Sequence, residues 1–227
     1  MNAASSIVTA PMLAIETSGS ACSVALVMPG AGAGRPPAHE IMATSHGHAT
    51  ALVPMIARIA RAADVELTAL KAIAVSCGPG GFTGIRVGLA TARAMALAIG
   101  CPIVGIGSFQ ALAATAARSG GALAARNLVV LDSRRSELFT IELGADLAAL
   151  SPPALLTAEL IEARCKQGNI ALVADAELTR LAGLGGLSAS ADAVAVAELA
   201  MTRSDLHLPA EPIYLRPPDI SQPKPRS

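Results

Sequence analysis

Runs of consecutive apolar residues alternate with helical patterns along the first half of the chain. Such runs predict buried strands, and apolar residues that recur every three to four positions predict helices. The predicted strands of this half are residues 12–17, 22–28, 39–45, 72–75 and 102–106. The predicted helices are residues 50–63, residues 83–99 and about ten residues from Ser108, with Thr50, Thr83 and Ser108 as the expected N-caps.

The second half of the chain repeats this theme. Its predicted strands are residues 127–132, 137–143 and 170–174, and its predicted helices are residues 157–166 and 192–202. Antiparallel strands followed by helical crossovers imply a mixed sheet with helices packed on it. The pattern therefore predicts an α/β fold with two duplicated lobes, residues 12–106 and 107–215. Residues 1–11 are expected to form a loose leader, and residues 216–227, rich in proline and polar residues, a disordered tail.

A glycine-rich segment, residues 76–88, joins a predicted strand to the helix that follows it. A strand, a tight turn and a helix N-terminus together present free backbone N–H groups to an anion. The segment lacks the Gly-Lys-Ser/Thr ending of a Walker loop and the glycine spacing of a Rossmann fold. It is therefore a specific motif, but of neither of these common nucleotide-binding types.

Small residues recur every four positions in that helix, at Gly84, Gly88, Ala92 and Ala96. A stripe of small side chains lets another backbone approach closely. Two interpretations are equally compatible with the pattern: the stripe packs on the sheet of its own lobe, or it forms a contact between subunits.

Composition narrows the function classes. Seventeen basic and seventeen acidic residues cancel, and aromatic residues are only 2% of the chain, so autonomous nucleic-acid binding and a base-stacking platform are not expected. If RNA is involved, we expect another subunit to make most of the contacts with it. Scattered single cysteines indicate a reduced, cytoplasmic protein. The apolar residues 87–107 invite a membrane span, but Arg93 and the break at residues 100–102 argue against one.

The densest charge cluster comprises Asp132, Arg134, Arg135 and Glu137. One interpretation is a solvated hairpin turn. The other is a set that faces a cleft and pairs with a partner subunit or a nucleotide, since arginine forks suit phosphates and carboxylates. The sequence favours neither.

Five motifs occur in an order that is known from one family. They are residues 12–18 (MLAIETS), His48 with Pro54, residues 78–88 (GPGGFTGIRVG), residues 132–139 (DSRRSELF) and residues 211–216 (EPIYLR). Together they resemble the TsaB (YeaZ) family, which belongs to the bacterial machinery that makes threonylcarbamoyladenosine in transfer RNA. The resemblance spans residues 12–216, nearly the whole chain.

The resemblance implies an actin-like, sugar-kinase-like (ASKHA) fold and the role of a non-catalytic scaffold subunit. The partners implied are the catalytic subunit TsaD and the ATPase subunit TsaE, with a homodimer when the chain is alone and tRNA bound only through the complex. No cofactor is expected in this chain, while ATP and a metal are expected in the partner subunits. Family members associate through the first two helices, which implies an interface at Met55, Ile59, Gly84, Val87, Gly88, Thr91, Ala92 and Met95.

The same resemblance places residues 16–20, ETSGS, where kinases of this fold keep an acidic phosphate loop. The favoured interpretation is a loop that no longer binds a nucleotide and whose residues serve to form the turn. The alternative is a loop that still contacts a nucleotide. Residues that could contact a nucleotide or a partner are Glu16, Thr17, Ser18, Gly80, Thr83, Arg86, Asp132, Arg134 and Glu137.

This sequence departs from the family pattern at several positions, and these departures argue against ATP binding within this chain. Gly81 stands where serine is usual, Ser136 where glycine is usual, and residues 172–176 lack the glycines expected beside an adenine. His46 and His48 lie two apart, but a metal site commonly needs three or four ligands, so a polar turn is favoured over a metalloprotease centre. The competing function is an actin-fold, ATP-dependent phosphotransferase acting on a small molecule.

Overall fold

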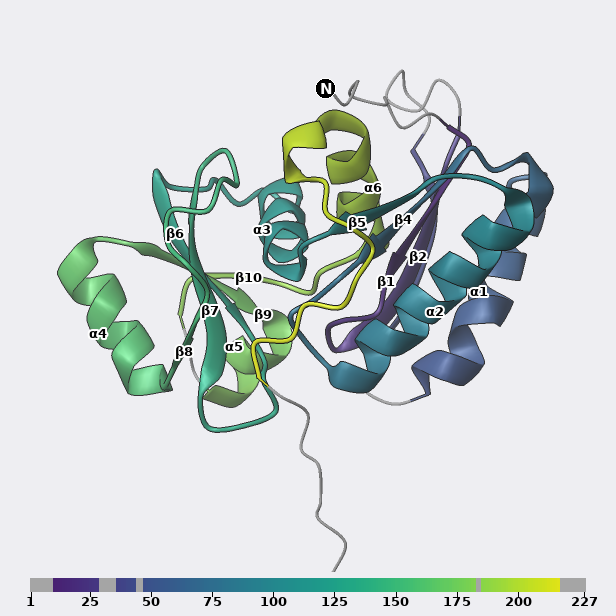
Figure 1. Cartoon of the computed structure of the whole chain (residues 1–227). Helices are drawn as coiled ribbons and strands as arrows, with labels where there is room; N and C mark the ends of the chain where they lie inside the picture. The colour runs from purple at the N-terminus through teal and green to yellow at the C-terminus, as the bar shows by residue number, and fades with distance from the viewer. Residues whose placement is uncertain (1–9, 29–35, 44–46, 183–184, 217–227) are drawn as a thin grey trace, which may run out of the picture.

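Two five-stranded sheets, each flanked by helices, form the protein (Figure 1). The structure is a computed structural model that describes residues 10–28, 36–43, 47–182 and 185–216. The predicted tail beyond residue 216 and residues 1–9 of the predicted leader lie outside this range.

The first sheet has the strand order β3-β2-β1-β4-β5. Its strands are β1 (Met12–Glu16), β2 (Ala21–Val27), β3 (Ala38–Ala43), β4 (Ala72–Ser76) and β5 (Ile103–Ile106). β1 pairs antiparallel with β2, and β2 with β3, whereas β4 runs parallel to both β1 and β5. Every residue of β1, β2 and β4 is buried, as expected for central strands covered on both faces.

The second sheet repeats this topology in the order β10-β9-β6-β7-β8. Its strands are β6 (Arg126–Leu131), β7 (Leu138–Gly144), β8 (Ala154–Leu156), β9 (Ala171–Asp175) and β10 (Leu187–Ala189). β6 occupies the place of β1: it pairs antiparallel with β7 and parallel with β9. The predicted duplication of a mixed sheet is confirmed, and the fold is actin-like. The three-residue strands β8 and β10 were not predicted.

Helices cover the outer faces of the sheets. α1 (His48–Ala62) packs on β2 and α2 (Phe82–Ile99) on β4, and the two helices contact each other. α4 (Ala158–Gly168) lies on the outer side of the second sheet, and α5 (Ala176–Ala182), which was not predicted, follows β9 (Figure 1). Short 3-10 helices lie at Leu67–Ala69 and Ser204–Leu206.

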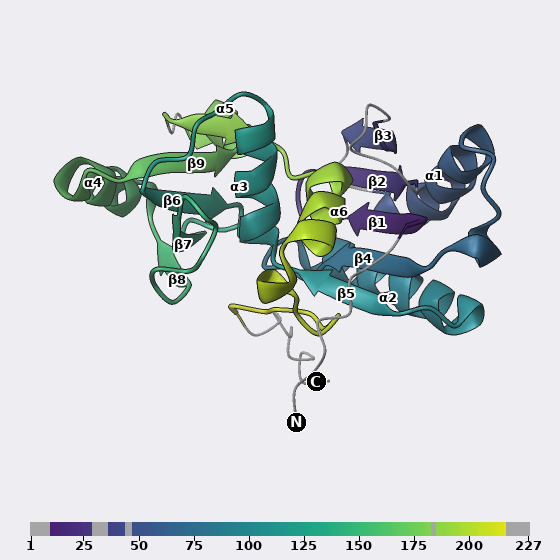
Figure 2. The ribbon, with the colours of Figure 1, turned by 90° about the horizontal axis from the view of Figure 1, so that it is seen from above.

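Two helices are exchanged between the lobes. α3 (Ser108–Arg118) follows the first sheet but packs on β6, β9 and β10, while α6 (Ala193–Thr202) follows the second sheet but packs on β1, β2, β4 and β5. The helices also contact each other, and Figure 2 shows them side by side between the sheets. One apolar core accordingly includes residues of both sheets. A boundary placed after residue 106 therefore assigns the strands to their two sheets. It does not divide the apolar core, because each sheet is covered by a helix from the other side of that boundary.

The segment after α6 also returns to the first lobe. Leu208 exchanges both backbone hydrogen bonds with Gly105 of β5, at 2.9 Å each, and Ile213 N donates to Cys77 O at 2.8 Å. Farther along, Arg216 forms an ion pair of 2.6 Å with Glu137, between β6 and β7. Residues 208–216 therefore cross from the first lobe to the second.

Three of the predicted N-caps are wrong. Gly47, Gly81 and Gly107 cap α1, α2 and α3, so Thr50, Thr83 and Ser108 fall inside the first turn. Thr50 Oγ1 donates to Gly47 O at 2.9 Å instead of accepting from the helix. Because α1 begins earlier than predicted, Pro54 is inside it and removes an interior hydrogen bond. Thr157 and Asp192, the first residues of two predicted helices, cap α4 and α6: each side chain accepts a hydrogen bond from the backbone N–H three residues later, of Leu160 and Ala195.

Candidate functional site

The β1–β2 turn holds a buried carboxyl group at the place where a phosphate loop was considered. Glu16 is fully buried, and its Oε1 accepts hydrogen bonds of 2.6 Å from both Ser18 N and Ser18 Oγ. Ser108 Oγ, at the start of α3, donates to Ser18 Oγ at 2.7 Å. The carboxyl group of Glu16 is thus held by hydrogen bonds from its own turn.

Burial raises the pKa of Glu16, and the hydrogen bonds from Ser18 offset this only in part. The Ser76 hydroxyl acts on the same carboxyl, but neither Ser76 Oγ nor Glu16 Oε2 has a partner with hydrogen-bond geometry. Thr17 is also fully buried, and its Oγ1 donates to Gly84 O at 2.8 Å. Glu16 and Thr17, both predicted as contacts for a nucleotide or partner, are therefore turned into the lobe, where an external ligand does not reach them.

The Glu16→Gln variant is expected to flatten the pH dependence of stability. A raised carboxyl pKa means that the native state holds a proton that the unfolded chain releases, so wild-type stability falls as pH rises from about the ordinary carboxyl pKa through the raised value. Glutamine has no proton to release. The free energy of unfolding in urea, measured from pH 4 to pH 8, should fall less for the variant than for wild type. Parallel curves would contradict the assignment.

The glycine-rich loop packs directly on this turn. Gly81 N donates to Ser18 O at 2.8 Å, and a Cβ atom at Gly80 would lie 2.3 Å from the same oxygen. A Cβ atom at Gly84 would lie only 2.0 Å from Thr17 O. These contacts explain why positions 80 and 84 are glycine: the backbone there touches the backbone of the β1–β2 turn.

The small-residue stripe packs inside its own lobe. Gly84, Gly88, Ala92 and Ala96 are all buried, and a Cβ atom at Gly88 would lie 2.3 Å from Thr17 Oγ1. Of the two interpretations left open by the sequence, packing on the sheet is therefore correct for this face of α2.

The predicted interface set is corrected accordingly. Met55, Ile59, Gly84, Gly88 and Ala92 are buried within the lobe, because they form the faces of α1 and α2 that cover the sheet. Val87, Thr91 and Met95 are half-buried and stay a prediction. The exposed large apolar side chains of these helices are Val53, 58% exposed, and Leu97, 86% exposed. Both were missed, although the helical period places them opposite the buried residues.

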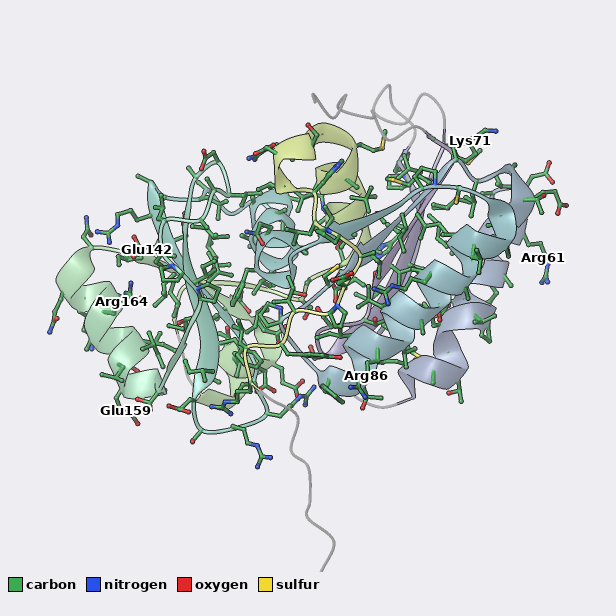
Figure 3. All side chains as sticks on the ribbon, in the orientation of Figure 1. Arg61, Lys71, Arg86, Glu142, Glu159 and Arg164 are labelled. Atoms are coloured by element: carbon green, nitrogen blue, oxygen red, sulfur yellow. The ribbon has the colours of Figure 1, made fainter. Side chains whose placement is uncertain are left out.

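A groove of about 370 Å³ opens between the glycine-rich loop and the second lobe. One wall is residues 79–82, another is the β6–β7 turn with Arg134 and Arg135, and the third is residues 213–216. Figure 3 shows Arg86 at the end of α2 nearest this region. Gly80 lines the groove, whereas Thr83 is exposed outside it. The nucleotide or partner contacts expected of these two residues stay predictions.

The β6–β7 turn faces the cleft. Arg134 has φ +60°, its N–H donates to Asp132 Oδ1 at 2.7 Å, and its guanidinium pairs with the same carboxylate at 3.2 Å. Arg134 and Asp132 also line a small cavity with Ser18 and Asp175, which has room for about one water molecule at 10 Å³. Burial, followed by the nearby charges of Glu177 and Asp132, raises the pKa of Asp175. The charged segment is a hairpin turn whose residues 134–137 are exposed, and it also borders the cleft, so both interpretations of the sequence remain open and its ligand stays a prediction.

The histidine pair and the apolar helix α2 are the remaining features that the sequence singled out. The described residues contain no group of three or more His, Cys, Asp or Glu side chains placed to hold a metal ion. His48 is buried at the start of α1 beside Gly84, and His46 lies outside the described residues. Within the described ranges, α2 is the helix with the length and composition of a membrane span; it packs on the first sheet, and Arg93 Nε donates to Ala210 O at 2.9 Å.

Two lobes of the same topology, with a cleft between the hairpin turns and joined by exchanged helices, define an actin-like protein. A model of the TsaD family, tRNA N6-adenosine threonylcarbamoyltransferase, matches residues 42–203. TsaB of Escherichia coli, a tRNA threonylcarbamoyladenosine biosynthesis protein, is 32% identical over 160 residues, which cover 69% of this chain and 66% of that protein. An uncharacterized protein of Mycobacterium tuberculosis is 32% identical over 183 residues, 79% of this chain and 80% of that protein.

The solved structure of YeaZ from Pseudomonas aeruginosa has the same fold, with a TM-score of 0.73 at 24% identity over 90% of this chain and 99% of that chain. The chain belongs to the TsaB/YeaZ family, within the wider group that the TsaD model describes.

Proposed function

We propose that this chain takes part in the biosynthesis of threonylcarbamoyladenosine in tRNA as a non-catalytic scaffold subunit. Membership of the TsaB/YeaZ family supports the pathway, since relatives in Escherichia coli and Haemophilus influenzae carry that function in their names. The partner is the catalytic subunit TsaD, with the ATPase TsaE docking on the pair and a homodimer forming when the chain is alone. ATP, metal and most of the contact with tRNA belong to those partners, in the cytoplasm.

The observation that carries the scaffold role is that α2 exposes apolar side chains on its outer face. Its buried face packs on the first sheet, and its outer face presents Leu97 together with the exposed alanines Ala90, Ala94 and Ala98, beside the exposed Arg86 and Arg93. Val53 adds an exposed apolar side chain on the neighbouring helix α1. An apolar helix face left in water marks a surface that another protein covers. Small side chains on it permit a close approach of a partner helix.

The buried carboxyl group of Glu16 supports the non-catalytic part of the proposal. A phosphotransferase of this fold needs an acidic group in the first turn that faces the cleft, whereas Glu16 is held inside by Ser18. A phosphotransferase also needs magnesium and phosphate to reach that turn, and the cavity beside it has room for about one water molecule. We therefore expect no ATP hydrolysis by the chain alone.

The Leu97→Glu variant is expected to weaken both the homodimer and the pair with TsaD by about tenfold or more, because a charge would be buried in an apolar contact. Leu160→Glu is the matched control, since Leu160 is an exposed leucine, 54% accessible, on α4 of the other lobe. Light scattering gives the mass, and titration with TsaD gives the affinity. Threonylcarbamoyl transfer by the reconstituted complex should fall in proportion to the loss of pairing with TsaD.

Two results would overturn the proposal. One is equal weakening by both leucine variants, or by neither, with the melting temperature unchanged. The other is ATP turnover by the purified chain that is lost in Glu16→Gln, which would favour the phosphotransferase instead.

A further inference from the structure

The segment that crosses from the first lobe to the second, residues 208–216, contains no helix and no named strand (yellow in Figure 1). Pro209, Glu211 and Pro212 are exposed along it. A segment without regular structure takes its position from the groups that hold it. This segment, the strap, is held at three places, and each place belongs to a different part of the molecule.

The first part of the strap is attached to the first sheet. Leu208 exchanges two backbone hydrogen bonds with Gly105 of β5, and Ile213 N donates to Cys77 O just beyond β4. Ala210 is buried in the apolar core beneath α2. This end of the strap is therefore fixed by backbone bonds and by burial.

The middle of the strap is held by side chains of α2. Arg93 Nε donates to Ala210 O at 2.9 Å, and Arg93 Nη2 donates to the same oxygen. Arg86 Nε donates to the Tyr214 hydroxyl at 3.0 Å, and the rings of Phe82 and Tyr214 lie 4.9 Å apart. Phe82, Arg86 and Arg93 are spaced by four and seven residues, so they share one face of the helix. The strap therefore follows the position of α2.

The last part of the strap reaches the second lobe. Leu215 packs against the apolar core that both sheets share, and Arg216 forms an ion pair of 2.6 Å with Glu137, the last residue before β7. The side chains of Arg216 and Glu137 are 27% and 48% exposed, and ion pairs this exposed are weak. This pair, the latch, joins the strap to the β6–β7 turn, whose Asp132 and Arg134 border the cleft.

We propose that the strap is one two-state unit, seated or released, which links α2 to the charged turn at the cleft. Side chains of α2 hold its middle, so a shift of this helix moves the strap, and the latch carries the movement to the turn. Coupling between two sites is reciprocal, so a change at the turn also alters how the strap sits on the first lobe.

The position of the strap gives this link a use. Leu97, on the face of α2 proposed for a partner, lies one helical turn beyond Arg93. A protein that covers Leu97 and shifts Arg93 would then reset the charged turn without touching it. This use rests on the proposed scaffold role, whereas the link itself is a property of the chain alone. The competing interpretation is a static cover for the edge of β5, whose two ends loosen independently.

Two reporters follow the strap in the full chain. The sequence contains one tyrosine, so 3-fluorotyrosine gives a single ¹⁹F resonance, at Tyr214. The nearby Phe82 ring separates the seated resonance from the released one, whose position is taken from the chain unfolded in urea. Hydrogen exchange of the Leu208 amide, which is bonded to Gly105 O, reports on the first-lobe end.

The Glu137→Gln variant removes the charge of the latch in the second lobe. We expect the released fraction at Tyr214 and the exchange rate of the Leu208 amide to rise together by about threefold, the effect of one exposed ion pair. Glu162→Gln is the matched control, because Glu162 forms an exposed ion pair with Lys166 inside α4. It should change neither reporter.

The Arg93→Met variant tests the link from the other side. Methionine keeps an apolar stem but loses the donors to Ala210 O, so the released fraction should rise about tenfold. We also expect the ¹H–¹⁵N resonance of the Arg134 amide, in the second lobe, to move. Arg61→Met is the control, since Arg61 is an exposed arginine on α1 (Figure 3).

Changes at both ends of the strap in the two test variants, and at neither end in the controls, support the proposal. It is overturned if Glu137→Gln leaves the exchange of the Leu208 amide unchanged, or if Arg93→Met leaves the Arg134 resonance in place. Equal changes in the control variants would also overturn it, because they would indicate a general loss of stability. The measurements need no partner, so their failure is distinguishable from a failure of the scaffold role, which is judged on pairing with TsaD.

Discussion

Replacing Gly84 with alanine is expected to destabilise the protein by about 2–3 kcal/mol and lower the melting temperature by about 5–10 °C. The new Cβ atom would lie 2.0 Å from Thr17 O, 3.2 Å from Thr17 C and 2.9 Å from His48 Nδ1. The first two of these atoms are backbone, so relief requires moving α2 away from β1. It would also disturb the hydrogen bond from Thr17 Oγ1 to Gly84 O.

Gly81→Ala is the matched control for this variant. Gly81 caps the same helix with φ −63°, and its Cβ atom would meet Ser18 O at an ordinary 3.6 Å. Alanine is the better helix former by about 1 kcal/mol, so a Gly84→Ala protein as stable as wild type would show that separating α2 from β1 costs only about that much, against the prediction. Thermal melting of the two variants and wild type decides the question.

The Asp192→Ala variant is expected to lose about 2–3 kcal/mol of stability, with a fall in melting temperature of about 5–10 °C. Asp192 is 7% exposed and caps α6, where its Oδ1 accepts from Ala195 N at 2.9 Å. Its other oxygen accepts from the guanidinium of Arg118 on α3. Alanine therefore leaves one helix N–H unsatisfied and removes the carboxylate from an arginine that is only 36% exposed.

Asp192→Asn separates the two contributions. Asparagine caps a helix about as well as aspartate, so this variant keeps the bond to Ala195 N and loses only the charge opposite Arg118. We expect about half of the destabilisation of the alanine variant, measured by denaturant unfolding. An asparagine variant as unstable as alanine would assign the whole effect to the ion pair.

The central strands were predictable because their physical cause is local. β1, β2 and β4 are buried on both faces, so each is an unbroken apolar run that the sequence displays directly. β8 and β10 have three residues each, which is too few for a period to emerge. The caps at Gly47, Gly81 and Gly107 were missed because the hydroxyl residues beside them match the usual preference more closely.

The candidate site was predictable only as a set of motifs. The stripe from Gly84 to Ala96 has the same spacing whether it packs on a sheet or on another subunit, so the sequence left the choice open. The structure decides for the sheet, because Gly84 and Gly88 pack directly against Thr17 at the end of β1. The groove depends on Phe82, Phe139 and Tyr214 meeting in space. Residues that lie far apart along the chain give no local signal of such a meeting.

The exchange of α3 and α6 has a consequence for synthesis on the ribosome. The first five strands emerge early, but the helix that covers their inner face is encoded at Ala193–Thr202, close to the end of the 227-residue chain. Until that segment is synthesised, the face of β1 that bears Met12 and Ala14 lacks the helix that packs on it. We therefore expect the first lobe to complete its fold only after α6 has been synthesised.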